Sequence, residues 1–305
     1  MPSVTSAAVE AKAAKLRAMV EAELGRVLGR EETILYQAMR YAVLGAGKRF
    51  RPLLTLAAAE AFGGAPAVRT ALPFAAAVEL IHSYSLVHDD LPCMDDDDTR
   101  RGKLSCHKAF GEDMALLAGD SLLTLAFEVM AGAAVPPAGR GRKVKVAAEM
   151  ARLAGPDGMI GGQVLDITHS PENATAESLF QLMLRKTGAL ITGAVRAGAI
   201  LGGAPPSALK AVTLYGENLG LAFQVRDDLD DTGAAGGASR SRRAAGARPA
   251  RASAEPNYAS FIGRDKARER LGQLVEGALA ALDKGRVGSP LLRHLALSLN
   301  RQERR

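Results

Sequence analysis

The stretch "LVHDDLPCMDDDDTRRGK", residues 86–103, places six aspartates within ten positions and follows them with two arginines and a lysine. An apolar, helix-like segment runs directly into this acidic cluster, so a solvated loop does not account for it. Crowded carboxylates at the end of a helix repel one another and oppose the helix dipole. A bound cation offsets that cost, and the stretch therefore predicts a metal site at a helix end.

The spacing inside this cluster requires a break in the helix. Asp89 and Asp95 are six residues apart, which on a regular helix separates them by about 240°. Pro92 has no N–H to donate to the carbonyl of His88, so the helix must kink or bulge there. A bulge at Leu91–Pro92 returns Asp95 to the side of Asp89, and we expect the two carboxylates to share a cation.

A second acidic cluster, "FQVRDDLDD" at residues 223–231, also ends a long apolar segment. Asp227 and Asp231 are four residues apart and share a helix face. Ligand sets made only of oxygen favour Mg²⁺ or Ca²⁺ over Zn²⁺, and Mg²⁺ completes its shell with water and phosphate oxygens. Basic side chains that bind phosphate occur in "GKRFR" (47–51) and directly after the first cluster. Charge alone therefore predicts a carboxylate–Mg²⁺–diphosphate site.

The composition favours an all-α fold in a single domain spanning residues 1–305. The chain is 48% hydrophobic and has no Trp, and few stretches alternate as strands do. Apolar segments with helical character and Gly or Pro stops follow one another along the chain. Residues 31–64 predict two helices around the break at Gly45–Gly47, and the second of them ends at Gly63–Gly64. We also expect helices at residues 7–28, 71–92, 113–134, 142–154, 175–201, 206–230 and 265–283, and one after a glycine break within 155–167.

Cys93 and Cys106 do not make a disulfide framework. Residues 1–30 show no secretory signal, and no run of about 18 uncharged apolar residues indicates a membrane span. We expect a cytoplasmic protein without stable membrane insertion.

The net charge of +6 is concentrated in one segment. Residues 232–254 contain five arginines, no acidic residue and no lysine. Such a segment cannot form a core and is typical of a flexible basic loop. The local origin of the charge makes a nucleic-acid surface a weak interpretation, and we expect no nucleic-acid partner.

The chain resembles the short-chain trans-polyprenyl diphosphate synthases, in particular bacterial farnesyl diphosphate synthases, over residues 30–231 and 255–300. Six motifs in the right order carry the resemblance: "GAGKRFRP" (45–52), "ELIHSYSLVHDDLPCMDDDDTRRGK" (79–103), "LAGDSLL" (117–123), "GGQVLDI" (161–167), "RKTGAL" (185–190) and "GLAFQVRDDLDD" (220–231).

The resemblance implies an all-α bundle around a deep central cavity, usually as a homodimer, with two Asp motifs facing each other across the cavity mouth. It implies about three Mg²⁺ ions, for which Mn²⁺ can substitute, on the diphosphate of an allylic substrate. The metal ligands that match the family are Asp89, Asp90, Asp95, Asp227, Asp228 and Asp231. The positions that match contacts to the allylic diphosphate are Arg100, Lys186, Thr187 and Gln224. Those that match the site for isopentenyl diphosphate are Gly47, Lys48, Arg51, His82 and Arg101.

The implied reaction is ionisation, condensation and elimination, in which isopentenyl diphosphate attacks the carbocation formed from dimethylallyl or geranyl diphosphate. The length of the product is set in this family just before the first Asp motif, where this chain has Tyr84 and Ser85. An aromatic residue at Tyr84, together with the two-residue insertion in the motif, resembles the farnesyl (C15) type. A geranylgeranyl (C20) synthase is the alternative.

The chain departs from the family at residues 233–254, where relatives carry lysines that help to close the allylic site. The abrupt loss and the recovery at "EPNYASFIG" (255–263) suggest a compensated frameshift, real or from sequencing, and resequencing would decide between them. A real segment predicts weaker binding of the allylic substrate, or an impaired homologue that acts as a non-catalytic partner subunit. A class I terpene cyclase also uses an Asp-rich motif and Mg²⁺, but it needs only one diphosphate site, so "GKRFR" and His82 favour condensation.

Overall fold

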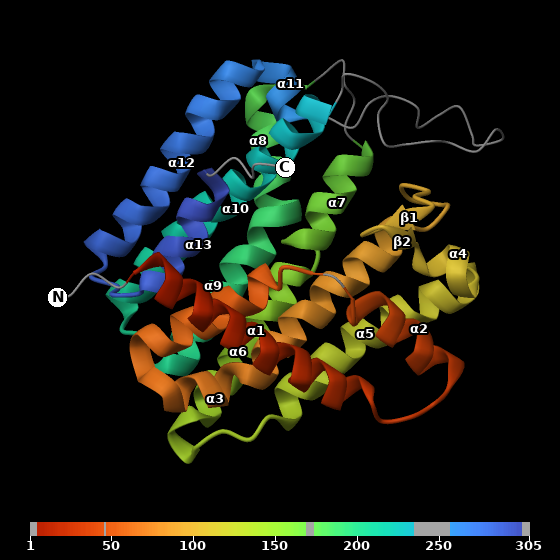
Figure 1. Cartoon of the computed structure of the whole chain (residues 1–305), viewed down its shortest axis with the longest axis horizontal. Helices are drawn as coiled ribbons and strands as arrows, with labels where there is room; N and C mark the ends of the chain where they lie inside the picture. The colour runs from red at the N-terminus through yellow and green to blue at the C-terminus, as the bar shows by residue number, and fades with distance from the viewer. Residues whose placement is uncertain (1–4, 46, 169–173, 235–256, 301–305) are drawn as a thin grey trace. The chain divides into compact units, whose positions relative to one another are not determined.

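The protein is described by a computed structural model that covers residues 5–45, 47–168, 174–234 and 257–300. Apart from one small hairpin, the regular elements of these residues are helical (Figure 1), which confirms the all-α prediction. Most of the predicted basic loop 232–254 lies outside the described residues, from residue 235 onward. The elements are α1 (Ser6–Leu28), α2 (Ile34–Val43), α3 (Phe50–Asp89), β1 (Thr99–Arg100), β2 (Lys103–Leu104), α4 (Cys106–Phe110), α5 (Glu112–Gly132), the short 3₁₀ helix η1 (Pro137–Gly139), α6 (Arg140–Ala154), α7 (Met159–Thr168), α8 (Ala176–Met183), the π-helical turn η3 (Leu184–Gly188), α9 (Ala189–Gly202), α10 (Pro206–Ala234), α11 (Tyr258–Ile262), α12 (Arg264–Lys284) and α13 (Pro290–Asn300).

The chain divides into two compact units, residues 1–148 with 197–203 and residues 149–196 with 204–305. In the first unit, α3 packs against α1, α2 and α5. Gly64 interrupts α3 with φ 62°, ψ −159°, where the sequence predicts a helix stop. Glycine tolerates this conformation because it has no Cβ. The continuous stretch after this kink ends at the first Asp-rich cluster.

Local capping sets the ends of several helices. The side chain of Thr5 accepts a hydrogen bond from the N–H of Ala8 at the start of α1, and Thr33 does the same for Tyr36 at the start of α2. Each bond satisfies an N–H group that the helix leaves unpaired. Gly111, with φ 95°, separates α4 from α5.

Two helices of the first unit, α3 and α5, are long and apolar enough to cross a membrane by length and composition alone. The most apolar 18-residue window of α3 is 67% buried, and that of α5 is 44% buried. Core helices of globular proteins pass the same test, so this finding is weak evidence for a membrane span.

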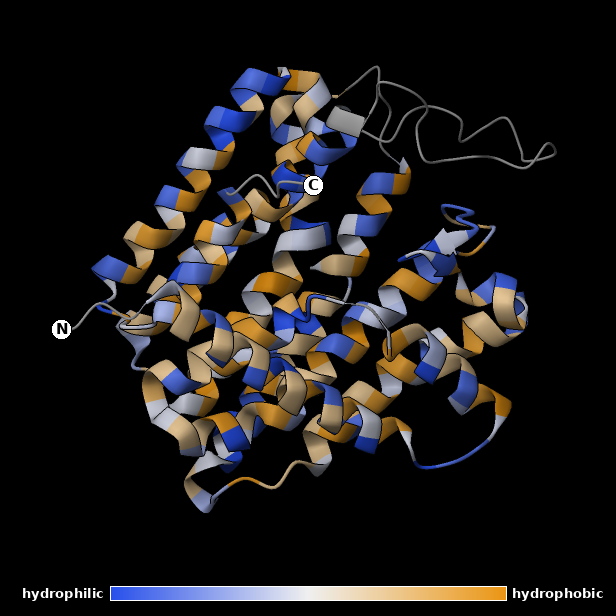
Figure 2. Ribbon diagram, in the orientation of Figure 1, coloured by the Kyte–Doolittle hydropathy of each residue, from blue (hydrophilic) through white to orange (hydrophobic). Residues whose placement is uncertain are grey.

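In the second unit, α10 packs against α11, α12, α13 and the turn η3. Tyr215 on α10 is fully buried and donates its hydroxyl to the carbonyl of Leu292 on α13 at 2.8 Å. Figure 2 shows hydrophilic and hydrophobic bands along α12, as expected for a helix with one solvated face. Its buried positions include Leu271, Leu274 and Leu282.

Candidate active site

The first Asp-rich cluster lies in a tight turn at the end of α3. The helix ends at Asp89, and Pro92 lies in the turn that follows. The N–H of Leu91 donates to the carbonyl of His88 at 3.2 Å, and that of Asp95 donates to the carbonyl of Asp89 at 2.8 Å. The backbone therefore returns Asp95 to Asp89, in agreement with the predicted bulge.

Asp90 is held by the protein itself. Its side chain is 3% exposed, and Arg100 donates from Nε to its Oδ1 at 2.8 Å. Arg100 Nη2 also donates to Oδ2 of Asp97 at 3.0 Å. Burial raises the pKa of Asp90, and the hydrogen bond from Arg100 opposes that rise only in part. Asp90 thus orients Arg100, whereas Asp89 is half-buried and Asp95 is exposed, so both can be reached by a cation.

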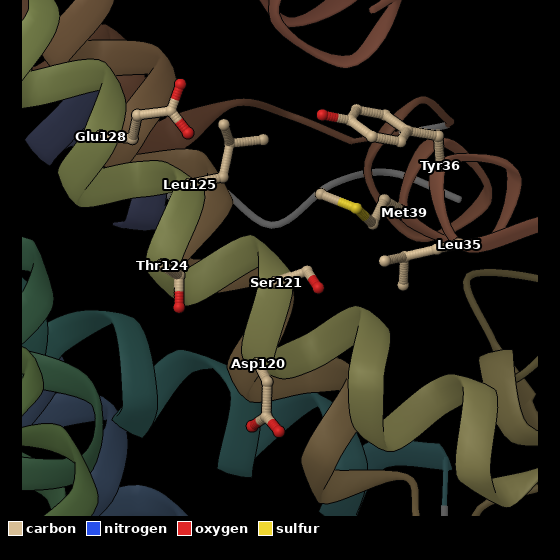
Figure 3. A pocket seen from close by; sticks show the side chains of 8 residues that line it. All are labelled: Leu35, Tyr36, Met39, Asp120, Ser121, Thr124, Leu125 and Glu128. Carbon is tan, nitrogen blue, oxygen red and sulfur yellow. The ribbon is translucent and has the colours of Figure 1, made fainter. Parts of the chain in front are cut away.

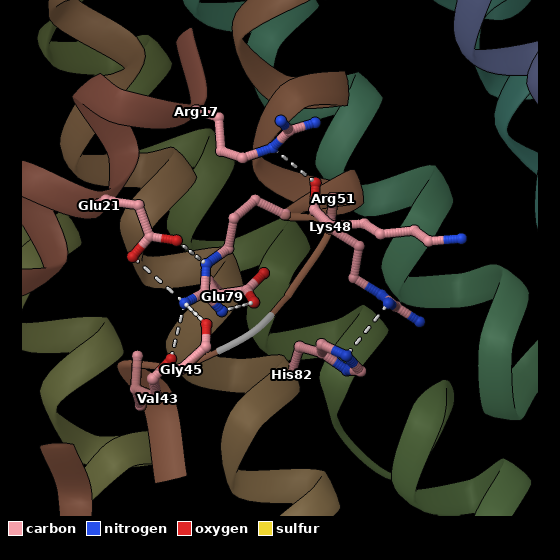
Figure 4. A network of polar contacts seen from close by, with 9 residues as sticks. Arg17, Glu21, Val43, Gly45, Lys48, Arg51, Glu79 and His82 are labelled. Carbon is pink, nitrogen blue, oxygen red and sulfur yellow. Dashed lines mark hydrogen bonds and ion pairs between the residues drawn. The ribbon is translucent and has the colours of Figure 1, made fainter. Parts of the chain in front are cut away.

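The residues predicted to bind a second diphosphate lie in the first unit around His82. Arg51 Nη1 lies 3.3 Å from Nε2 of His82, and Figure 4 shows the two side chains pointing toward each other. Burial and the charges of Arg51 and Arg101 lower the pKa of His82 well below its usual value. His82 is therefore neutral near pH 7 and accepts from Arg51, because a guanidinium can only donate. Lys48 precedes α3 and is exposed. A concentration of positive charge around a neutral histidine suits an anion.

Arg101 is placed by the turn of a small hairpin. β1 and β2 pair antiparallel and leave the two-residue loop Arg101–Gly102, whose φ angles are 54° and 81°. Two successive positive φ angles are typical of the tight turns that match the twist of a hairpin. Lys103 Nζ lies 3.8 Å from the centre of the Tyr41 ring, so the hairpin is docked on α2.

Gly47, predicted to contact substrate, lies against two guanidinium groups. A Cβ at this position would be 2.8 Å from Nη1 of Arg49 and 3.2 Å from Nη1 of Arg101. The arginines therefore pass over bare backbone here, and a larger residue would displace them.

Tyr84 and Ser85, predicted to set product length, lie on α3 before the Asp-rich turn. Tyr84 is 5% exposed, and its hydroxyl has no hydrogen-bond partner among the described residues. Burial raises its pKa to about 12. Ser85 Oγ donates to the carbonyl of His82 at 2.9 Å. His88 Nε2 lies 3.1 Å from the carbonyl of Leu116 on α5.

In the second unit, close contacts at glycine bring three elements together. A Cβ on Gly162 of α7 would lie 2.2 Å from the backbone nitrogen of Lys186, and one on Gly220 of α10 would lie 2.5 Å from Cα of Gly188. Since real Cβ atoms do not approach this closely, the packing of η3 between these helices requires glycine. This packing places Lys186 and Thr187.

A chain of hydrogen bonds leads from Thr187 to the second Asp cluster. Thr187 Oγ1 donates to Gln224 Oε1 at 2.8 Å, and Gln224 Nε2 donates to Asp228 Oδ1 at 2.9 Å. Asp228 Oδ2 accepts from the N–H of Tyr258 at 2.7 Å. Burial raises the pKa of Asp228, although the hydrogen bond from Gln224 acts to lower it. Asp228 therefore anchors the first residue of α11 to the second Asp cluster.

The other two predicted metal ligands of this cluster, Asp227 and Asp231, lie exposed on α10. Lys186 forms an ion pair with Asp166 of α7, so the second unit also combines a basic side chain with acidic groups. Gln163, next to this pair on α7, has a buried Nε2 without a hydrogen-bond partner among the described residues. A buried polar group without a partner is costly, and such groups occur at sites that bind a ligand.

The described residues include one group of acidic and histidine side chains that could share a single metal ion, which the sequence did not predict. Ligand atoms of Asp96, Asp98 and His107 lie within 4.8 Å of one another. Lys108 Nζ is 2.9 Å from Asp98 Oδ1, and Ser105 Oγ is 3.1 Å from Nδ1 of His107. The protein itself already provides partners for two members of this group.

The predicted ligand set fits Mg²⁺ by its chemistry. The accessible carboxylates Asp89, Asp95, Asp227 and Asp231 offer oxygen only, and Mg²⁺ prefers few carboxylates with water and phosphate completing its shell.

A pocket of about 290 Å³ lies between α2 and α5 (Figure 3). None of the predicted site residues lines it. The lining residues are Leu35, Tyr36, Met39, Asp120, Ser121, Thr124, Leu125 and Glu128.

Sequence reasoning missed the buried partners of the site. Arg49 is 1% exposed and Glu79 is 2% exposed, and they form an ion pair at 2.8 Å. The signal available was an unassigned arginine inside "GKRFR" and a glutamate one helical turn before His82.

Comparison with known proteins agrees with these observations. The sequence model "Polyprenyl synthetase" matches residues 32–237. The chain is 45% identical over 217 residues to the farnesyl diphosphate synthase of Geobacillus stearothermophilus, a match that covers 70% of this chain and 71% of that protein. It is 41% identical over 263 residues to the chloroplastic geranylgeranyl pyrophosphate synthase of Catharanthus roseus, covering 84% and 71%.

A crystal structure of an FPP/GFPP synthase from Zymomonas mobilis matches with a TM-score of 0.82 at 32% identity, covering 97% of this chain and 100% of that chain. Sequence model, relatives and fold agree with the six motifs. The chain therefore belongs to the trans-polyprenyl diphosphate synthases, the polyprenyl synthetase family, and is a prenyltransferase.

Proposed function

We propose that the protein condenses isopentenyl diphosphate with dimethylallyl or geranyl diphosphate to give farnesyl diphosphate. The observation that carries this proposal is the cationic group around neutral His82, which is separate in sequence from the basic residues of the second unit. Two sets of phosphate-binding residues suit a reaction with two diphosphate substrates. A terpene cyclase, with one diphosphate, leaves the His82 group without a role.

Asp89, Asp95, Asp227 and Asp231 are proposed to hold the metal ions. Bound Mg²⁺ would supply charge stabilisation for the departing diphosphate. Asp90 and Asp228 belong to the same motifs, and their burial and hydrogen bonds support a role in orienting Arg100 and Gln224.

The basic side chains act on the allylic diphosphate. Arg100 and Lys186 bind its oxygens and stabilise the negative charge that develops as the C1–O bond breaks. Thr187 and Gln224 are joined by a hydrogen bond of 2.8 Å. In the proposed reaction, the main-chain carbonyls near Lys186–Thr187 and the side-chain oxygen of Gln224 stabilise the positive charge that develops on the allylic carbon.

The second substrate binds through the first unit. Lys48, Arg51, His82 and Arg101 hold the diphosphate of isopentenyl diphosphate against the backbone at Gly47. Its double bond then attacks the allylic carbon, a C–C bond forms, and a proton is lost to the departed diphosphate. No protein nucleophile is required.

The farnesyl product is the finer part of the proposal. Relatives include both farnesyl and geranylgeranyl synthases, so the family leaves C15 and C20 open. The buried aromatic ring of Tyr84, five residues before Asp89, supports a short pocket and a C15 product. A C20 product is the alternative. An impaired homologue is the other alternative, and it depends on residues 232–254, most of which lie outside the described residues.

The proposal is tested by turnover of isopentenyl diphosphate with geranyl diphosphate in Mg²⁺, with chromatography of the products. Asp89→Asn and Asp227→Asn should each lower kcat by about 100-fold or more, because they weaken charge stabilisation in the transition state. Asp265→Asn on the exposed start of α12 is the matched control and should leave kcat unchanged. Consumption of geranyl diphosphate without isopentenyl diphosphate would instead indicate a cyclase, and no product with either allylic substrate would favour the impaired homologue.

A further inference from the structure

Arg49 is buried among residues that bind the second substrate in the function proposed above, yet it has no place in that chemistry. It lies between Lys48 and Arg51 and is 1% exposed. We infer that Arg49 is a positioning residue, which holds the loop before α3 in the shape that binds the diphosphate of isopentenyl diphosphate. The inference rests on the proposed function of this loop.

The guanidinium of Arg49 is fully engaged by acceptors of the protein. Nε and Nη2 donate to the two oxygens of Glu21 at 2.6 and 3.2 Å, and Nη1 donates to Glu79 Oε1 at 2.8 Å. Nη2 also donates to the carbonyls of Val43 at 2.8 Å and Gly45 at 3.1 Å. Bonds from all three nitrogens of the guanidinium go to the protein, so Arg49 acts through its neighbours.

These bonds close the loop that carries Lys48. The two carbonyls belong to Val43, the last residue of α2, and to Gly45 just after it. Arg49 is the N-cap residue of α3 and has φ 49°, a strained conformation for a non-glycine residue. Arg17 of α1 adds a second tie, because its Nε donates to the carbonyl of Lys48 at 3.3 Å (Figure 4). α1, α2 and α3 thus meet at this loop through two arginines.

The network also balances the charge beside the anion site. Glu79 lies one helical turn before His82 on α3, so the two share a face. The negative charge of Glu79 acts to raise the pKa of Arg101 as well as that of Arg49, and the charge of Glu21 acts in the same direction. Because Nη1 groups of Arg49 and Arg101 both lie over Gly47, a shift of the Arg49 guanidinium would move Arg101 and the backbone beside Lys48.

Arg49→Lys tests the inference, because it keeps the charge but loses the planar fork that bonds two carboxylates and two carbonyls. We expect KM for isopentenyl diphosphate to rise by about tenfold, while KM for geranyl diphosphate changes by less than about twofold. Glu21→Gln is a milder second variant, because the Glu21 side chain is half-buried and 38% exposed. It should shift the same KM in the same direction.

Arg40→Lys is the matched control. Arg40 also bonds two backbone carbonyls, those of Leu28 and Glu31, and pairs with Glu32. These three partners are not among the residues proposed to bind the second diphosphate, so the variant should leave both KM values unchanged. An equal rise of both KM values in Arg49→Lys, or the same selective rise in Arg40→Lys, would overturn the inference.

Calorimetric titration with inorganic diphosphate in the absence of metal separates this inference from the proposed reaction. Wild type that binds diphosphate tightly and Arg49→Lys that binds it about tenfold more weakly would support the positioning role even without turnover. Equal affinities in the two proteins, or no binding by wild type, would overturn it. Absence of product with intact diphosphate binding would count against the proposed function alone.

Discussion

His82 lies among arginines, and its protonation makes the stability of the folded protein depend on pH. Its pKa in the folded protein is well below the value of about 6.5 expected in the unfolded chain. As the pH falls below 6.5, the unfolded chain takes up a proton that the folded protein does not, so stability is lost. The contribution of His82 is complete above pH 6.5.

Wild-type Tm should therefore fall more steeply between about pH 7.5 and 5.5 than that of His82→Gln, which keeps an acceptor for Arg51 but cannot titrate. Scanning calorimetry at several pH values measures the slopes. His294→Gln on α13 serves as the control and should follow wild type. Parallel slopes for wild type and His82→Gln would show that His82 is not the group responsible.

Tyr84 is the residue that we propose limits the length of the product. Its ring is buried, and its hydroxyl has no hydrogen-bond partner among the described residues. We therefore expect the volume of the ring, and not the hydroxyl, to limit the length of the product. Tyr84→Ala should open space one turn before the Asp-rich turn and lengthen the main product from C15 to C20. Tyr84→Phe keeps the ring and should keep the C15 product. Chromatography of dephosphorylated products distinguishes the two, and an unchanged product from Tyr84→Ala would rule out this control of length.

At the scale of elements, the turn η3 depends on glycine contacts with α7 and α10. Gly220→Ala would place a methyl group 2.5 Å from Cα of Gly188, and overpacking of this kind costs about 1–3 kcal/mol. We expect a lower free energy of unfolding together with weaker binding of the allylic substrate, since Thr187 and Gln224 move apart.

Gly272→Ala on α12 is the matched control for this prediction. No atom lies within 4 Å of a Cβ there, and alanine is favoured over glycine in a helix by about 0.5–1 kcal/mol. The control should therefore raise stability. Denaturant unfolding measures both variants, and a Gly220→Ala protein as stable as wild type would contradict the packing described for η3.

The elements also show how far the sequence predicts the fold. The helix over residues 7–28 and the break at Gly63–Gly64 follow from apolar spacing and glycine, and the structure has both. Residues 175–201 were predicted as one helix, but a π-helical turn interrupts them at Leu184–Gly188. This turn depends on tertiary contacts with Gly162 and Gly220, which local periodicity does not contain. The hairpin at residues 99–104 and helix α13 were not predicted either.

At the scale of the whole molecule, six ordered motifs predicted the family and the all-α fold, and both are confirmed. The aspartates that could bind metal were named, but their different surroundings were not. Asp90 and Asp228 are buried and hydrogen-bonded, whereas Asp95 and Asp231 are exposed. Adjacent aspartates look alike in sequence, and only the fold decides which one faces Arg100 or Tyr258.

The homodimer implied by the resemblance stays a prediction at this scale. Light scattering after size-exclusion chromatography should give twice the chain mass of 31.9 kDa. A mass equal to one chain over a wide range of concentrations would show that the protein does not dimerise.

The incorporation of labelled isopentenyl diphosphate into product, with geranyl diphosphate and Mg²⁺, tests the central claim most directly. We expect one labelled product of 15 carbons with a single label per molecule, and no product when the metal is chelated. Consumption of geranyl diphosphate without incorporation of label, or no reaction with either allylic substrate, would contradict it.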